Sequence, residues 1–137
     1  MAFTHEDRTA VTELLALHGH LFDAGELDRL DELFTVDVVY DVADFGGPPL
    51  RGVAALRDAA LALGAGNPVA HHITNVVLTE VTDDRAQVLS KGLGVLADGT
   101  TGSVTYEDTV VRGADGWRIA HRKVVARRVP LGGKGGA

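Results

Sequence analysis

Six histidines are the main candidates for acid–base chemistry in this chain of 137 residues: His5, His18, His20, His71, His72 and His121. Neutral imidazole is the side chain best suited to accept a proton near neutral pH. The chain has no cysteine, which excludes a cysteine nucleophile, a thiolate zinc site and disulfides. The chemistry to consider first is therefore proton transfer by a histidine.

His71 and His72 open a β-rich segment, His-His-Ile-Thr-Asn. Neighbouring side chains of a strand point to opposite faces, so only one of the two can enter a cavity, and the pair cannot ligate one metal without distortion. The alternation places His71 on one face with Ile73 and Asn75. The spacing alone leaves two interpretations equally open: one functional histidine in this pair, or two structural histidines.

Two further polar residues belong to the first predicted helix. His18 lies on its apolar stripe, which fits either a half-buried structural histidine or a functional one. Asp23 stands at the end of the helix, beside Phe22 and before Gly25. A negative charge is mildly disfavoured at a helix C-terminus, so Asp23 is either a solvated end residue or a residue kept for function.

The elements that must position these residues follow from periodicity and turn signals. Apolar residues at helical spacing predict a helix that Thr4 caps, a short second helix from about Leu27 and a third helix over 53–63. Strand-like segments then cover 36–42, 69–81, 86–97, 103–112 and 117–129, the last four separated by turns such as Asp98-Gly99. Helices followed by long antiparallel strands predict an α+β fold: three N-terminal helices packed on a strongly curved antiparallel sheet, forming a conical pocket for a small apolar ligand. We expect one domain over 1–129 and a flexible glycine-rich tail over 130–137.

Composition narrows the class of protein. Apolar residues make up 45% and charged residues 23%, as in ordinary globular domains. No run of 18 apolar residues occurs, and the first residues lack a signal-peptide pattern, so we expect a cytoplasmic protein with no membrane partner. Thirteen basic against nineteen acidic residues give a net charge of −6, which argues against nucleic acid as a partner.

The last predicted strand is basic, with Arg118, Arg122, Lys123, Arg127 and Arg128. We expect a solvated or inter-subunit face here in preference to an anion site. Arg122 stands apart because it shares a mixed face with Val124 and Ala126. A separate stretch, Gly92-Leu-Gly-Val-Leu-Ala, matches the glycine spacing of a dinucleotide-binding motif, but a hairpin turn follows it in place of the required helix.

Several of these segments, in this order and spacing, resemble the SnoaL-like branch of the nuclear transport factor 2-like superfamily over about residues 6–128. The segments are 20–34, Asp37-Val-Val-Tyr-Asp, His71-His-Ile-Thr-Asn, Tyr106-Glu-Asp and Asp115-Gly-Trp-Arg-Ile with Arg122. The resemblance implies a curved sheet wrapped by helices around a conical pocket, commonly in a homodimer. Relatives in this branch include scytalone dehydratase, a hexachlorocyclohexane dehydrochlorinase, bile acid dehydratase and polyketide cyclases.

The elimination enzymes of the branch share an aspartate at the end of helix one and a histidine at the start of the strand after helix three. Those positions match Asp23 and His71, so the resemblance implies His71 as general base and Asp23 as the carboxylate that orients it. Substrate-contacting candidates that follow from it are His18, Phe22, Tyr40, Val42, Asn75, Tyr106 and Arg122. No cofactor and no metal are expected.

The chain also departs from scytalone dehydratase. That enzyme has a tyrosine immediately before its aspartate, where this chain has Phe22, and a second histidine on the next strand, where Ser90-Lys-Gly-Leu-Gly has none. These differences argue against a dehydration in which tyrosines hold the departing water. A substrate with a good leaving group, an isomerisation or an aldol-type cyclisation fits the remaining pair better.

Three functions compete at this point. The first is a cofactor-free lyase or isomerase, of dehydratase or cyclase type, that abstracts a proton from a small hydrophobic substrate such as a polyketide. The second is a non-catalytic module of the same fold, which binds a small molecule or forms a dimeric interaction surface. The third is a metal-dependent enzyme in which His18, His71 and His121 converge, although no local motif supports this arrangement.

Overall fold

The computed structural model describes residues 2–135, so residues 136 and 137 of the predicted tail lie outside the described part. Helix α1 (His5–Asp23) comes first, followed by the 3₁₀ helix η1 (Leu27–Glu32) and strand β1 (Phe34–Asp41). The chain continues through η2 (Ala43–Phe45), β2 (Leu50–Arg51), α2 (Val53–Leu63) and η3 (Gly64–Gly66). Four long strands and a short helix complete it: β3 (Ala70–Val81), β4 (Arg85–Val95), β5 (Thr101–Gly113), β6 (Gly116–Arg127) and η4 (Pro130–Gly133). The predicted α+β class with three N-terminal helices is confirmed, the second helix being the 3₁₀ helix η1.

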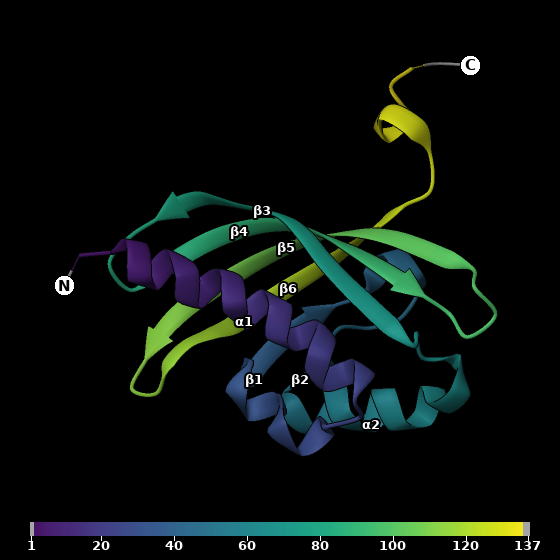
Figure 1. Ribbon diagram of the computed structural model, residues 1–137, viewed down its shortest axis with the longest axis horizontal. Helices are drawn as coiled ribbons and strands as arrows, with labels where there is room; N and C mark the ends of the chain where they lie inside the picture. Colours follow the sequence, from purple (N-terminus) through teal and green to yellow (C-terminus); the bar gives the residue numbers. More distant parts are fainter. Residues whose placement is uncertain (1, 136–137) are drawn as a thin grey trace.

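The strands form one open, curved sheet in the order β2-β1-β6-β5-β4-β3, as Figure 1 shows. Consecutive long strands pair antiparallel, as the turn signals predict, and bulges interrupt β3 and β6. Strand β1 pairs with β6 in parallel, and this pairing joins the two ends of the chain in one sheet. Neither that pairing nor the two-residue strand β2 was predicted, because a distant partner leaves no local pattern in the sequence.

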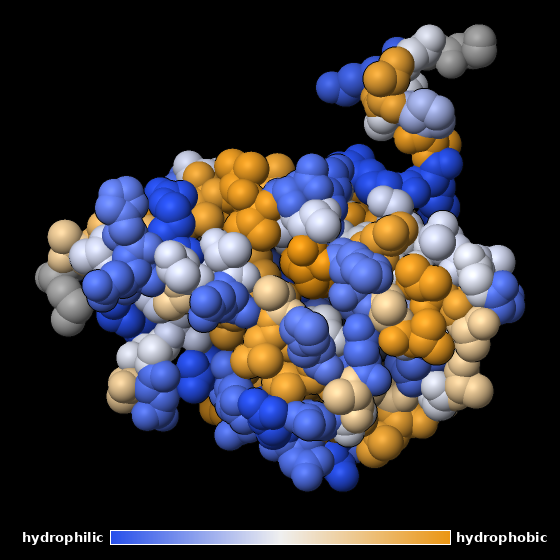
Figure 2. Space-filling view, in the orientation of Figure 1, coloured by the Kyte–Doolittle hydropathy of each residue, from blue (hydrophilic) through white to orange (hydrophobic). Residues whose placement is uncertain are grey.

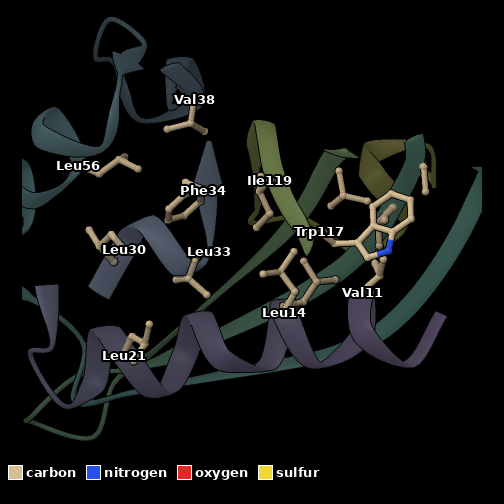
Figure 3. Packing of buried hydrophobic residues seen from close by; sticks show 14 residues of the cluster. Val11, Leu14, Leu21, Leu30, Leu33, Phe34, Val38, Leu56, Trp117 and Ile119 are labelled. Atoms are coloured by element: carbon tan, nitrogen blue, oxygen red, sulfur yellow. The ribbon is translucent and has the colours of Figure 1, made fainter. Parts of the chain in front are cut away.

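Helix α1 packs its apolar face on the sheet (Figure 3). Val11 and Leu14 of α1 face Trp117 and Ile119 of β6, and all four side chains are buried. The helix begins with a capping box: the hydroxyl oxygen of Thr4 accepts the backbone N–H of Asp7, and the carboxylate of Asp7 accepts the backbone N–H of Thr4. The core therefore fixes the axis of α1 across the sheet and, with it, the position of the helix end.

The surface is mixed in character. Figure 2 shows hydrophilic residues over much of one face, with apolar residues gathered where β3 begins and β4 ends. Exposed apolar side chains of this region include Val69, Leu93 and Leu96. No helix within residues 2–135 combines the length and the apolar character needed to cross a membrane. The segment after β6 carries η4 away from the body of the molecule (Figure 1).

Candidate active site

The structure brings Asp23 and His71 into direct contact. One carboxylate oxygen of Asp23, Oδ1, lies 2.6 Å from Nδ1 of the His71 ring. The other, Oδ2, accepts the backbone N–H of His71 at 3.0 Å. The carboxylate therefore fixes both the backbone and the ring of His71, and the ring nitrogen that stays free is Nε2.

Gly19 allows this contact, because it lies one turn before Asp23 on α1, where the helix touches β3. A Cβ atom at Gly19 would lie 2.7 Å from the backbone oxygen of His71, closer than real Cβ contacts come. Only glycine lets the helix approach the strand so closely. Sequence reasoning missed Gly19 because the reason for the glycine is a contact with a residue 52 positions later.

His71 lines a cavity of about 590 Å³ on the concave side of the sheet. Strand register explains the space: His71 pairs with Gly94, and Gly94 pairs with Gly102, so two neighbouring positions beside His71 carry no side chain. Apolar groups make up most of the remaining wall, namely Phe45, Pro68, Leu96, Val104, Val124 and Ala126. The glycines of the rejected dinucleotide motif are thus part of a cavity floor.

Tyr106 supplies a hydroxyl group to the same cavity. Its ring reaches across β4 to Gly92, where a Cβ would lie 2.4 Å from a ring carbon, so glycine is required there as well. Burial raises the pKa of Tyr106, and the phenol therefore stays protonated and able to donate a hydrogen bond. Tyr106 is buried and makes no hydrogen bond through its hydroxyl within residues 2–135.

A buried ion pair lies against the other face of the Tyr106 ring. Arg122 donates to both carboxylate oxygens of Asp108, at 2.7 and 2.8 Å, and both side chains are fully buried. The guanidinium carbon lies 4.0 Å from the centre of the Tyr106 ring. Burial alone would lower the pKa of Arg122, but Asp108 raises it above its usual value, so the cation persists. Asp108 was not predicted as a site residue, although its place on β5 directly opposite Arg122 on β6 follows from the register.

His18 is enclosed next to the pair of catalytic candidates. Its ring centre lies 5.8 Å from that of His71 and 5.9 Å from that of Tyr106. Burial, and then the positive charge of Arg122, lower the pKa of His18 well below 6.5, so the ring is neutral. Within residues 2–135, neither ring nitrogen of His18 has a hydrogen-bond partner, and the same holds for Nη1 of Arg122.

Comparison with known proteins places the chain in a family. Residues 4–123 match the family described as the SnoaL-like domain. The chain belongs to this family. Its fold is the nuclear transport factor 2-like fold, as the resemblance predicted.

Solved structures agree with that assignment. A nuclear transport factor 2-like protein with a cystatin-like fold from Novosphingobium aromaticivorans is 30% identical, with a TM-score of 0.75 over 92% of this chain and 85% of that chain. The Kfla4162 protein of Kribbella flavida is 26% identical, with a TM-score of 0.77 over 93% and 95% of the two chains. A candidate scytalone dehydratase from Novosphingobium aromaticivorans is 20% identical, with a TM-score of 0.73 over 88% and 84%. No protein of curated function matches the sequence.

The remaining predicted site residues of this SnoaL-like domain lie outside the cavity wall. Tyr40 is half-buried with its ring centre 5.9 Å from the Arg122 guanidinium carbon, and Val42 is half-buried beside η2. The ring centre of Phe22 lies 4.6 Å from that of His18 and 6.1 Å from that of His71, and Phe22 lines a second cavity of about 640 Å³ together with Asp23. None of these three residues is part of the wall of the cavity beside His71.

The expectation that Asn75 shares a face with His71 is wrong. Asn75 has a left-handed backbone with φ of 56°, and the register of β3 shifts between Thr74 and Val77. The bulge adds one residue to the strand, so Asn75 is exposed and Val76 turns to the core in its place. An alternation pattern cannot reveal a bulge, although asparagine is among the residues that tolerate this backbone conformation.

The histidines do not converge. His72 and His121 are exposed, whereas His18 and His71 turn inward. Among residues 2–135, no three histidine, aspartate or glutamate side chains are grouped so that they could hold a metal ion. The arrangement of His18, His71 and His121 that the third competing function requires is therefore not formed among these residues.

Proposed function

We propose that this SnoaL-like domain is a cofactor-free lyase or isomerase that removes a proton from carbon in a small hydrophobic substrate. The observation that carries the proposal is the 2.6 Å contact between Asp23 and Nδ1 of His71 at the wall of an apolar cavity. A neutral imidazole whose Nδ1 proton is held by a carboxylate presents its other nitrogen as a base. His71 is thus the general base, and Asp23 is the residue that orients it.

The reaction begins when Nε2 of His71 takes a proton from a carbon next to a carbonyl group. The electron pair of the broken C–H bond moves into the carbonyl group and makes an enolate, or it expels a leaving group from the neighbouring carbon. In an isomerisation the imidazolium returns the proton to a different carbon. In an elimination the leaving group departs with its electron pair, and the proton passes to solvent. Asp23 stabilises the imidazolium in either case.

Tyr106 is the group best placed to stabilise the enolate. Its hydroxyl faces the cavity, and burial keeps it protonated. The Arg122 cation at 4.0 Å from the ring draws electron density from the phenol and improves it as a hydrogen-bond donor. The mostly apolar wall excludes water, which strengthens both contacts.

A non-catalytic ligand carrier is the second candidate, because the cavity alone is enough to bind a small apolar molecule. The two candidates differ in what His71 does. A carrier loses little affinity when His71 is replaced, whereas an enzyme loses its turnover.

The test uses 1-tetralone, a small apolar ketone with exchangeable protons at C2, in D₂O with detection by ¹H NMR. We expect the wild-type protein to accelerate deuterium exchange above the buffer rate and His71→Ala to abolish the acceleration. His72→Ala is the matched control, because His72 is the adjacent, exposed histidine and should leave exchange unchanged. Unchanged exchange in His71→Ala would remove His71 as the base. Ligand binding without exchange in the wild type would favour the carrier.

A further inference from the structure

Four residues lie side by side in a row across the sheet, with His71 first and Arg128, one residue past β6, last. His71 pairs with Gly94 and Gly94 with Gly102, and Ser103 pairs with Arg127. Continued by one residue past β6, this antiparallel register places Arg128 opposite Gly102. The row thus has a base at one end, a cation at the other and two glycines between them. Three strand spacings separate the two ends, a distance of about 14 Å.

The cavity contains all four members of this row, and the Arg128 guanidinium lies 5.3 Å from the centre of the Phe45 ring at its edge. Within residues 2–135, Arg128 forms no ion pair. The neighbouring Arg127 directs its Nε to the hydroxyl of Thr105, at 3.0 Å, on the opposite face of the sheet. Arg128 is therefore the cation available to a ligand in the cavity.

The charges of the wall favour an anion. The ionisable residues that line the cavity are His71, Tyr106, Arg127 and Arg128, and no acidic residue lines it, although the chain has a net charge of −6. One acidic group lies near this edge: the carboxylate of Asp44 accepts the backbone N–H of Ala126 at 3.0 Å. That bond engages one oxygen of Asp44, and within residues 2–135 no ion pair joins Asp44 to Arg128.

We propose that the ligand of this cavity is an amphipathic carboxylate. Its apolar body lies over Gly94 and Gly102, its carboxylate binds Arg128 at the edge, and its other end reaches His71. A planar guanidinium binds a carboxylate through two parallel hydrogen bonds, which makes the pairing stronger and more directional than a contact with a neutral group. The assignment of the reacting carbon to the His71 end rests on the proposed function, whereas the carboxylate at Arg128 does not. The proposal departs, at Arg128, from the expectation that the basic residues of the last strand form a solvated or inter-subunit face.

The test compares 2-naphthoate with 2-naphthamide, which have the same shape and differ in charge, by isothermal titration calorimetry. We expect the wild-type protein to bind the carboxylate about tenfold more tightly than the amide. Arg128→Gln should remove this preference and leave the affinity for the amide unchanged. Arg57→Gln is the matched control, since Arg57 is an exposed arginine on α2, away from the cavity, and should keep the preference.

A second variant tests the location. Gly102 has no atom within 4 Å of the position of a Cβ, so Gly102→Val fits the strand and fills the cavity, and it should weaken both ligands. Equal wild-type affinity for the two ligands, binding of neither, or a preference retained in Arg128→Gln would overturn the proposal. The preference should persist in His71→Ala. If His71→Ala keeps the preference for the carboxylate, but the wild-type protein does not accelerate deuterium exchange of 1-tetralone, the proposed catalytic function is wrong and the anion site is supported.

Discussion

Replacing Asp23 with asparagine should change which nitrogen of His71 carries the proton. In the native pair, Oδ1 of Asp23 accepts the proton of Nδ1 and Oδ2 accepts the backbone N–H of the same residue. The amide oxygen of asparagine can still accept the backbone N–H, but its NH₂ group then faces Nδ1. Nδ1 must become the acceptor, so the tautomer with its proton on Nε2 is favoured, and the nitrogen that faces substrate can act as a base only in the disfavoured tautomer.

The expected decrease in the exchange rate follows from the hydrogen bond between Asp23 and His71. A hydrogen bond to a charged group contributes about 1.5–3 kcal/mol. If the imidazolium of the transition state feels the full loss, exchange should slow by about 10- to 150-fold. The side chain of Asp23 is 26% exposed, and solvent weakens the contact, so we expect a loss in the lower half of this range.

The assay is deuterium exchange of 1-tetralone by wild-type protein and Asp23→Asn, with thermal unfolding to establish that both are folded. Asp28→Asn is the matched control, because Asp28 is an exposed carboxylate on η1 with no side-chain hydrogen bond within residues 2–135. A change of less than threefold in Asp23→Asn, with the fold intact, would refute the role of Asp23 as the orienting group.

Four further predictions concern the surroundings of the pair. His18 is buried and neutral in the folded protein, whereas His18 of the unfolded chain takes up a proton below pH 6.5. The free energy of unfolding should therefore fall by up to about 1.4 kcal/mol per pH unit as the pH drops below 6.5. Urea titrations at several pH values should show this dependence in the wild type and not in His18→Phe. Gly19→Ala forces α1 away from the backbone oxygen of His71, so it should lower the free energy of unfolding by about 1–3 kcal/mol. It should also slow deuterium exchange, and an unchanged exchange rate would show that the close approach does not position Asp23. Arg122→Met leaves Asp108 buried without its partner and should lower the free energy of unfolding, measured by chemical denaturation, by about 3–5 kcal/mol. The double variant Arg122→Met with Asp108→Leu should recover much of this stability. No recovery would mean that lost packing, and not the unpaired charge, destabilises Arg122→Met. Tyr106→Phe should slow exchange by about 100-fold with little change in stability, and a wild-type rate would exclude its hydroxyl as the enolate donor.

Much of the fold was accessible from the sequence because it rests on local patterns. The boundaries of α2 match the predicted helix over 53–63, and the four long strands lie within a few residues of the predicted ones. The parallel pairing of β1 with β6 was not accessible, since it depends on the packing of segments about 80 residues apart. The bulge at Asn75 was missed for a similar reason: the alternation of side chains was assumed to continue through a position where the backbone is left-handed.

The site was predictable in part. The resemblance pointed to Asp23 and His71, and the structure places them in contact. The residues around them were harder to predict, because their positions depend on strand register. Asp108 opposite Arg122, the glycines beside His71 and the cation at Arg128 become meaningful only when β3, β4, β5 and β6 lie side by side. Single glycines in a strand segment gave no sign that they made room for a ligand.

The measurement that tests the central claim most directly is a long-range ¹H–¹⁵N correlation spectrum of the histidine rings, recorded above pH 7 with and without 1-tetralone. We predict that His71 carries its proton on Nδ1, that its Nε2 is unprotonated, and that the ketone shifts the Nε2 signal of His71 and leaves that of His72 unchanged. A proton on Nε2 of His71, or a ketone that binds without moving this signal, would contradict the claim that His71 is the base.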